Sequence, residues 1–203
     1  MSDRSGRGNG AIVVIDESIA KLDSGEIYIV AAAVVAPSTE RDSVTLNART
    51  ALRSGSATRK RPFHWTDEGP AVRTAMVDVL THRAVSVISC QSELISPRHF
   101  ERARIGLMGS LIEAACEREN VELVLFESRE KDLRAVGQNR SDHEVITAAR
   151  HAGVVPYSAH YDWIDKSEPL CWLADAAAGA VNRNVCGDPN FTDRLDTWFD
   201  ITP

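Results

Sequence analysis

The chain has 203 residues, of which 43% are hydrophobic and 26% are charged, a composition typical of a globular protein with one sizeable core. Its formal net charge of −6 argues against a protein that coats nucleic acid non-specifically, but not against a nuclease whose acidic centre lies beside a local basic patch. No apolar run is long enough to span a bilayer, so we expect no membrane contact. The four cysteines form no Cys-x-x-Cys pair, which favours free thiols in a reducing cytoplasm over a zinc site.

The chain opens with a polar stretch rich in Gly, Ser and Arg over residues 1–10, which predicts a disordered tail ahead of a single domain over residues 11–203. Residues 11–15 are apolar and mostly β-branched, a pattern typical of a strand buried on both faces. This run leads directly into Asp16 and Glu17, so we expect the strand to end there. Burying a carboxylate is costly unless it is paired, which makes this strand end the first candidate site.

The rest of the chain alternates between predicted strands and helices. Apolar and β-branched runs predict four more strands, over residues 27–36, 84–91, 121–126 and 154–161. Helical spacing and capping signals predict helices over residues 38–53, 67–82, 97–120, 141–152 and 170–185, with a short helix or irregular tail after them. Residues 54–62 are the best loop candidate. This order predicts an α/β fold with a mixed five-stranded sheet flanked by helices.

Three carboxylates are expected to meet at one edge of this sheet. Asp16 and Glu127 each follow an apolar strand, and Asp175 interrupts the apolar stripe of the last helix, whose small residues 176–180 permit close approach to the sheet. Sites in such sheets form beyond the carboxyl ends of the strands. The carboxylates would repel one another unless cations neutralise them, and their oxygens suit Mg²⁺ or Mn²⁺. Taken singly, each could instead begin a turn, form a salt bridge or cap a helix.

His64 is a further candidate, because it lies between Phe63 and Trp65 directly after a basic stretch. It could act as general acid, metal ligand or phosphate contact, and its aromatic neighbours could stack on bases. It could equally anchor a loop. The basic stretch could contact nucleic acid or form a solvated loop, and it contains Arg49, Arg53, Arg59, Lys60 and Arg61.

Two segments carry a resemblance to a known family. Residues 15–18 read Ile-Asp-Glu-Ser after an apolar strand, and residues 173–175 read Leu-Ala-Asp ahead of small residues near the end of the chain. They resemble the signature segments of a ribonuclease-H-like family, the one catalogued as domain of unknown function 3800. The resemblance covers nearly the whole chain in its order of elements. It implies a ribonuclease-H-like fold and a metal-dependent nuclease or integrase-like active site.

Two positions depart from the family pattern. Ile19 stands where the family usually has glycine, and Pro62-Phe63-His64 offers the histidine of a Glu-x-His motif without its glutamate. Carried over by position, the resemblance implies that Asp16 is the metal-bridging carboxylate of the first strand.

The sequence thus leads us to expect a nuclease that cleaves phosphodiester bonds of RNA or DNA with Mg²⁺ or Mn²⁺. Two metal ions bound side by side can act together in this reaction. The alternative is a catalytically degenerate module that binds nucleic acid or a partner protein. A phosphatase with Asp16 as nucleophile fits less well, because Ser18 stands where such enzymes carry a second acid. The apolar and aromatic last helix leaves room for a homodimer. The expected metal ligands are Asp16, Glu17, Glu127 and Asp175, with His64 as a further catalytic residue and Arg59, Lys60, Arg61 and Trp65 as substrate contacts.

Overall fold

One mixed sheet organises the computed structural model, which describes residues 10–54, 61–128 and 138–201. Its strands lie in the order β5-β4-β1-β2-β3-β6. β1 (Ala11–Leu22) pairs antiparallel with β2 (Gly25–Val35), and β2 pairs antiparallel with β3 (Val85–Ile95). On the other side of β1, β4 (Val121–Glu127) and then β5 (His160–Ile164) add in parallel. The sheet is therefore α/β and mixed, but it has six strands and not the expected five.

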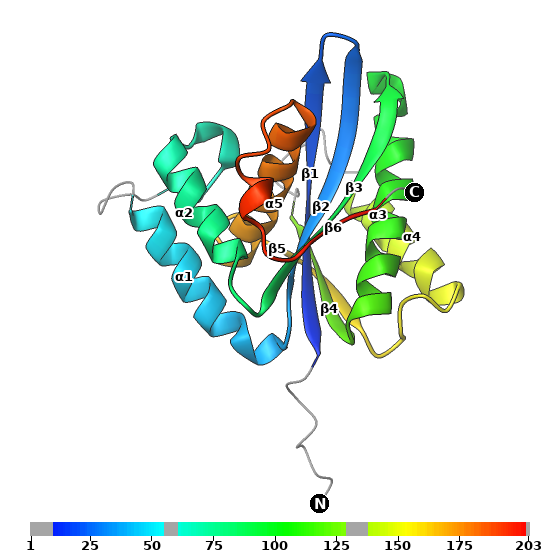
Figure 1. The fold of residues 1–203 in the computed structure, drawn as a ribbon. Coiled ribbons are helices and arrows are strands. Elements are labelled where there is room, and N and C mark those ends of the chain that lie inside the picture. The colour runs from blue at the N-terminus through cyan, green and yellow to red at the C-terminus, as the bar shows by residue number, and fades with distance from the viewer. Residues whose placement is uncertain (1–9, 55–60, 129–137, 202–203) are drawn as a thin grey trace, which may run out of the picture.

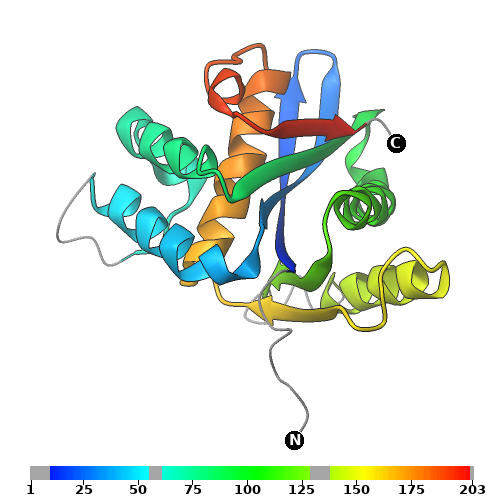
Figure 2. The same cartoon turned by 60° about the horizontal axis from the view of Figure 1, so that its bottom comes forward.

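Helices cover both faces of the sheet (Figure 1). On one face lie α1 (Arg41–Arg53), α2 (Pro70–Leu80) and α5 (Pro169–Val185), and α5 runs along β1 and β2 (Figure 2). The opposite face is covered by α3 (Phe100–Arg118) and α4 (Gln138–His151). Within the described ranges, four short 3₁₀ helices connect these elements: Ser38–Glu40, Trp65–Asp67, Pro97–His99 and Thr192–Arg194.

β1 is buried on both faces, because its apolar residues alternate between the two cores. Ile12 and Val14 lie in the core beneath α5, whereas Val13 and Ile15 lie in the core beneath α3. The expectation that this strand ends at Asp16 is wrong, since its pairing with β2 continues to Leu22. What ends near Asp16 is the parallel neighbour β4, whose last residue is Glu127. Asp16 therefore lies within β1, level with the end of β4.

Other boundaries also differ from the prediction. The predicted strand over residues 154–161 begins only at His160, because Gly153 has a φ of 76° and Pro156 has no N–H to donate to a sheet. The helix predicted from residue 141 begins at Gln138, so Ser141 is not its cap. Where we expected a short helix or an irregular tail, the short 3₁₀ helix Thr192–Arg194 is followed by β6 (Trp198–Ile201), which pairs in parallel with β3. The helix predicted from residue 67 begins at Pro70, after Gly69.

The predicted tail of residues 1–10 can be compared with the structure only at its last residue, Gly10. Residues 1–9, most of the expected tail, lie outside the described part of the chain. Gly10 is buried, and its carbonyl accepts the N–H of Ser38 at 2.6 Å. Among the described residues, no helix is both long and apolar enough to cross a membrane.

Candidate functional site

Asp16 and Glu127 occupy neighbouring positions on two adjacent parallel strands. The register of β1 and β4 pairs Ile15 with Phe126, the residues directly before them. Two positions earlier in each strand, Val14 and Leu125 lie in the core beneath α5. Because side chains alternate along a strand, Asp16 and Glu127 point to that same face.

The third carboxylate, Asp175, comes from α5, which covers this face. The small side chains of residues 176–178 allow α5 to lie close to the sheet, and they are almost fully buried as a result. The Oδ2 atom of Asp175 accepts the backbone N–H of Trp65 at 2.9 Å and lies 3.2 Å from Nδ1 of His64. Three distant segments of the chain therefore meet here, with His64 at the rim.

Burial and mutual repulsion disfavour the ionised forms of these carboxylates. The pKa of Asp16 is raised well above its usual value, first by desolvation and then by the negative charges of Asp175 and Glu127. Desolvation also raises the pKa of Asp175, although its two hydrogen-bond partners partly offset this effect. A cation placed among the carboxylates would favour their ionised forms.

Lys166 supplies one such cation, and we did not expect it from the sequence. Its Nζ lies 2.8 Å from Oε1 of Glu127. Partial desolvation lowers the pKa of Lys166, but the hydrogen bond to Glu127 and the attraction of the nearby carboxylates outweigh it and raise the pKa overall. The signal for this residue was available: Lys166 comes just after β5, at the carboxyl end of a parallel strand, where Glu127 also lies.

A pocket of about 270 Å³ opens at this point, and we call it the carboxylate pocket. Cys171 is part of its wall, and burial and the nearby carboxylates raise the pKa of this thiol well above its usual value. The thiol therefore stays protonated and is a poor nucleophile. The described residues that line the pocket are Arg61, Pro62, Phe63, His64, Asp67, Glu127, Lys166, Cys171, Trp172 and Asp175.

Trp65 does not offer its ring to a substrate, contrary to our expectation of a stacking contact. The residue is 6% exposed, because its ring lies against α5 at Gly179, where a Cβ atom would come within 2.2 Å of Trp65 Cδ2. Phe191 meets the ring edge-on at 5.0 Å between centroids, and the guanidinium of Arg73 lies 5.2 Å from the ring centroid. Phe63 is buried as well. What Trp65 gives the site is its backbone N–H, which holds Asp175 in place.

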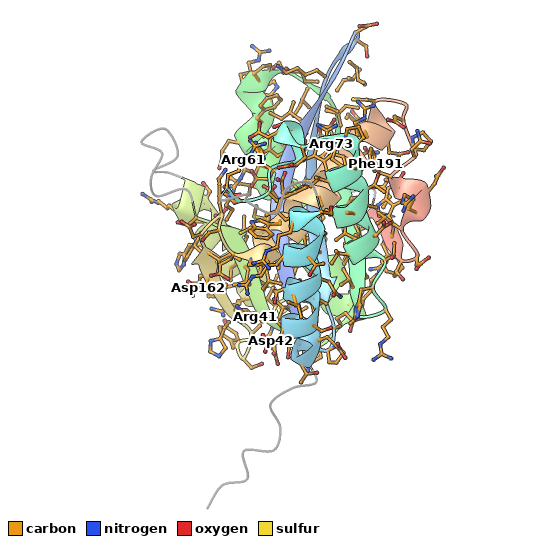
Figure 3. All side chains as sticks on the ribbon, turned by 90° about the vertical axis from the view of Figure 1, so that its left-hand side faces the viewer. Arg41, Asp42, Arg61, Arg73, Asp162 and Phe191 are labelled. Carbon is orange, nitrogen blue, oxygen red and sulfur yellow. The ribbon has the colours of Figure 1, made fainter. Side chains whose placement is uncertain are left out.

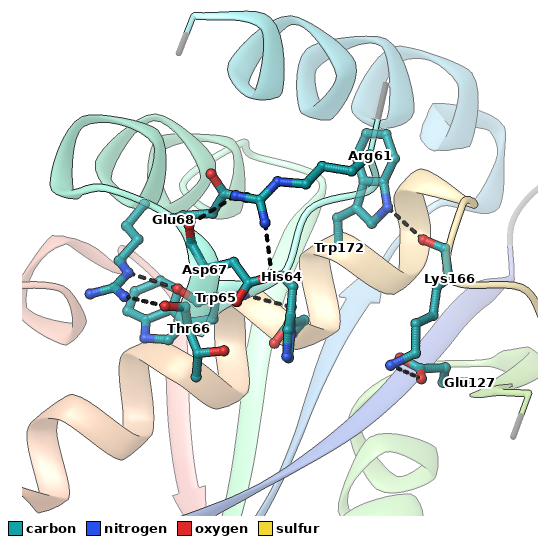
Figure 4. A network of polar contacts seen from close by, with 11 residues as sticks. Arg61, His64, Trp65, Thr66, Asp67, Glu68, Glu127, Lys166 and Trp172 are labelled. Carbon is teal, nitrogen blue, oxygen red and sulfur yellow. Dashed lines mark hydrogen bonds and ion pairs between the residues drawn. The ribbon is translucent and has the colours of Figure 1, made fainter. Parts of the chain in front are cut away.

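The basic loop is described only in part. Arg59 and Lys60, two of the expected substrate contacts, lie outside the described residues. Arg61 donates to Oδ2 of Asp67 at 2.9 Å and to the carbonyl oxygen of Asp67 at 3.0 Å. Figure 4 shows these contacts beside His64, with the Glu127–Lys166 pair further along the same region. Arg61 is thus held at the rim of the carboxylate pocket by an acidic partner.

Glu17, expected as a metal ligand, lies on the other face of the sheet. It follows the alternation of Val13 and Ile15, and its carboxylate accepts a hydrogen bond from Nε of Arg104 at 2.8 Å. The hydroxyl of Tyr28 also donates to it, at 3.2 Å. Because the sheet separates Glu17 from the carboxylate pocket, we leave it out of the metal ligands proposed below.

The environment of Glu17 is a buried ion-pair network centred on Arg104, which is 2% exposed. A second carboxylate, Asp142 of α4, pairs with the other end of the guanidinium. Its Oδ2 atom accepts the indole N–H of Trp163 at 3.1 Å. Desolvation lowers the pKa of Arg104, but the two carboxylates outweigh it and raise the pKa, so the guanidinium stays charged. This network joins β1, α3, α4 and β5.

The donor set at the carboxylate pocket fits a hard divalent cation, because it consists of carboxylate oxygens. In the part of the chain that the structure describes, however, no three His, Cys, Asp or Glu side chains are arranged to hold a metal ion. Comparison with known proteins adds no further assignment: no family model matches the chain, and no curated protein matches it.

Proposed function

We propose that this chain is a divalent-metal-dependent nuclease with a ribonuclease-H-like fold, and that Asp16, Glu127 and Asp175 hold Mg²⁺ or Mn²⁺. The observation that carries the proposal is that three carboxylates, from β1, β4 and α5, converge on one face of the sheet. Desolvation and the charges of Asp175 and Glu127 together raise the pKa of Asp16 there. The central position of β1, between an antiparallel hairpin and parallel strands, supports the fold assignment.

Each residue around the pocket has a definable task in this proposal. Trp65 fixes the rotamer of Asp175 through its backbone N–H. If His64 donates from Nδ1 to Asp175, its other nitrogen, Nε2, is left to take up a proton from water or return one to a leaving oxygen. Lys166 offsets the negative charge of Glu127. When bound, the divalent ions would activate a water and stabilise charge on the leaving oxygen.

The test is cleavage of labelled single- and double-stranded RNA and DNA with Mg²⁺ or Mn²⁺. We expect D16N and D175N each to abolish cleavage, because each removes a negative charge and a hard oxygen ligand. D196N is the matched control, since it makes the same change at Asp196, which is exposed and does not line the pocket. Cleavage by D16N and D175N at the rate of D196N would refute the proposal.

A catalytically degenerate module that binds nucleic acid or a partner protein is the second candidate. The ion pair between Lys166 and Glu127 favours it, because an internal cation already occupies one of the carboxylates. Ile19 does not decide between the two, since it lies in regular pairing with Tyr28 and requires no turn. Nucleic-acid binding by the wild-type protein without cleavage in either metal would favour the module. The expected homodimer gains no support from α5, whose apolar side chains are buried within this chain.

A further inference from the structure

A second pocket of about 270 Å³ adjoins the carboxylate pocket, and we call it the arginine pocket. The two pockets share Arg61, Pro62 and Trp172 in their walls. Figure 4 shows α1 passing over Arg61 and Trp172, which lie on the side of the site away from Glu127. The described residues that line the arginine pocket are Arg49, Leu52, Arg53, Arg61, Pro62, Ser167 and Trp172.

The charge of the arginine pocket is opposite to that of its neighbour. Among the described residues, its lining holds three arginines and no carboxylate. Arg61 is engaged with Asp67, but within the described residues neither Arg49 nor Arg53 forms an ion pair with a carboxylate. Both side chains are exposed. In a chain with a net charge of −6, two such guanidinium groups beside an acidic centre form a local site for an anion.

The placement of Arg49 and Arg53 on α1 gives this site its geometry. Residues four apart on a helix lie on the same face, about 6 Å apart along the axis. In Figure 3, Arg41 and Asp42 mark the N-terminal end of α1, and Arg61 lies near its C-terminal end. The last residue of α1 at that end is Arg53. Arg53 also offsets the helix dipole, whose effect is confined to the last turn. Arg49 lies one turn earlier, so the dipole does not account for it.

We propose that Arg49 and Arg53 bind a backbone phosphate of a nucleic acid strand whose reacting phosphodiester lies in the carboxylate pocket. The inference rests on the proposed nuclease function and extends it to the path of the substrate. Guanidinium groups bind phosphate oxygens in a bidentate manner. Contacts to phosphate position a strand and do not read its sequence. Trp172 forms an apolar wall, since it is buried and its indole N–H donates to the carbonyl of Lys166 at 2.7 Å.

The arginine pocket predicts sequence-tolerant binding that depends strongly on salt. We would measure fluorescence anisotropy of short labelled single-stranded RNA and DNA oligonucleotides in Ca²⁺ buffer, to limit cleavage, over a series of salt concentrations. For R49A/R53A we expect about tenfold weaker binding at low salt. We also expect the slope of log K against log salt to fall by about 0.7 for each phosphate that the variant no longer neutralises.

The matched control is R98A/R102A, which removes the same charge from two exposed arginines. Arg98 lies in the 3₁₀ helix Pro97–His99 and Arg102 in the first turn of α3, which covers the opposite face of the sheet. Equal affinity and equal salt slope for R49A/R53A and R98A/R102A would overturn the inference. So would thermal stabilisation by inorganic phosphate without any oligonucleotide binding, which would make the site one for a small anion.

The same series separates this inference from the proposed function. If wild-type protein binds oligonucleotides through Arg49 and Arg53 but cleaves none with Mg²⁺ or Mn²⁺, the nuclease proposal fails and the phosphate site stands. If wild-type protein cleaves, and R49A/R53A cleaves and binds as the control does, the phosphate site fails and the nuclease proposal stands.

Discussion

The contact between Gly179 and Trp65 offers a sharp test of how the site is held together. Gly179 lies in the interior of α5, and a Cβ atom there would come within 2.2 Å of Cδ2 of Trp65. The ring is also buried and flanked by Phe191 and Arg73, so moving it would disturb these contacts. The substitution Gly179→Ala should therefore displace Trp65, and with it the N–H that holds Asp175.

Gly109 in α3 provides the matched substitution, because an added Cβ there meets no atom within 4 Å. Replacing glycine by alanine in a helix stabilises it by about 0.5–1 kcal/mol, so we expect G109A to raise the free energy of unfolding by that amount. G179A has the same gain in helix propensity but adds overpacking that costs about 1–3 kcal/mol. We expect G179A to be less stable than G109A by about 1–3 kcal/mol.

Urea unfolding followed by far-ultraviolet circular dichroism measures both free energies with the same probe. Calorimetric titration with Mn²⁺ then asks whether the folded G179A protein binds the metal more weakly, as breaking the Trp65–Asp175 hydrogen bond predicts. If G179A proves as stable as G109A, Trp65 is not confined against α5, and our account of how Asp175 is positioned is wrong.

Two further predictions concern the charges at the carboxylate pocket. The folded-state pKa of Asp16 is raised, so the folded protein binds more protons than the unfolded chain above pH ~4, and stability should fall as pH rises through the folded-state pKa. In metal-free buffer D16N should reduce this fall, leaving the part that the raised pKa of Asp175 contributes, and stabilise the protein by about 0.5–2 kcal/mol at neutral pH. A fall in stability with pH that is equally steep in D16N and in wild-type protein would contradict this. K166M removes the cation paired with Glu127, so it should bind Mn²⁺ several-fold more tightly by calorimetry and lower the stability in EDTA by at most about 1 kcal/mol, since Lys166 is largely exposed. Weaker Mn²⁺ binding by K166M would instead make the lysine part of the site.

Local sequence patterns predicted much of the fold. The continuous apolar run of residues 11–15 predicted that β1 is buried on both faces, and helical spacing predicted α5 within one residue of its observed bounds. The length of β1 was not, because polar residues 16–18 remain in a strand only through pairing with β2. β6 was not predicted for a similar reason: it has four residues, half of them exposed, and it forms a strand only by pairing with β3.

The side-chain partners around the site were harder to predict, since they come from remote parts of the chain. Glu17 and Arg104 are 87 residues apart, and no spacing rule links them. The burial of Trp65 depends on a glycine in α5, and a lone glycine within a helix does not reveal what lies against it. A sequence pattern can indicate which residues are chemically capable, whereas the partner that engages each one is set by tertiary structure.

The two adjacent acids of β1 show why the distinction matters for function. Glu17 faces α3, where Arg104 and Tyr28 satisfy its carboxylate, so its charge is balanced within the protein. Asp16 faces α5, where its neighbours are two further carboxylates, and among the described residues no lysine or arginine forms an ion pair with it. Desolvating an acid without balancing its charge costs free energy. Because Glu17 has an ion-pair partner, whereas Asp16 has only the electrostatic attraction of Lys166, the nuclease that we propose would take the cation for Asp16 from solution.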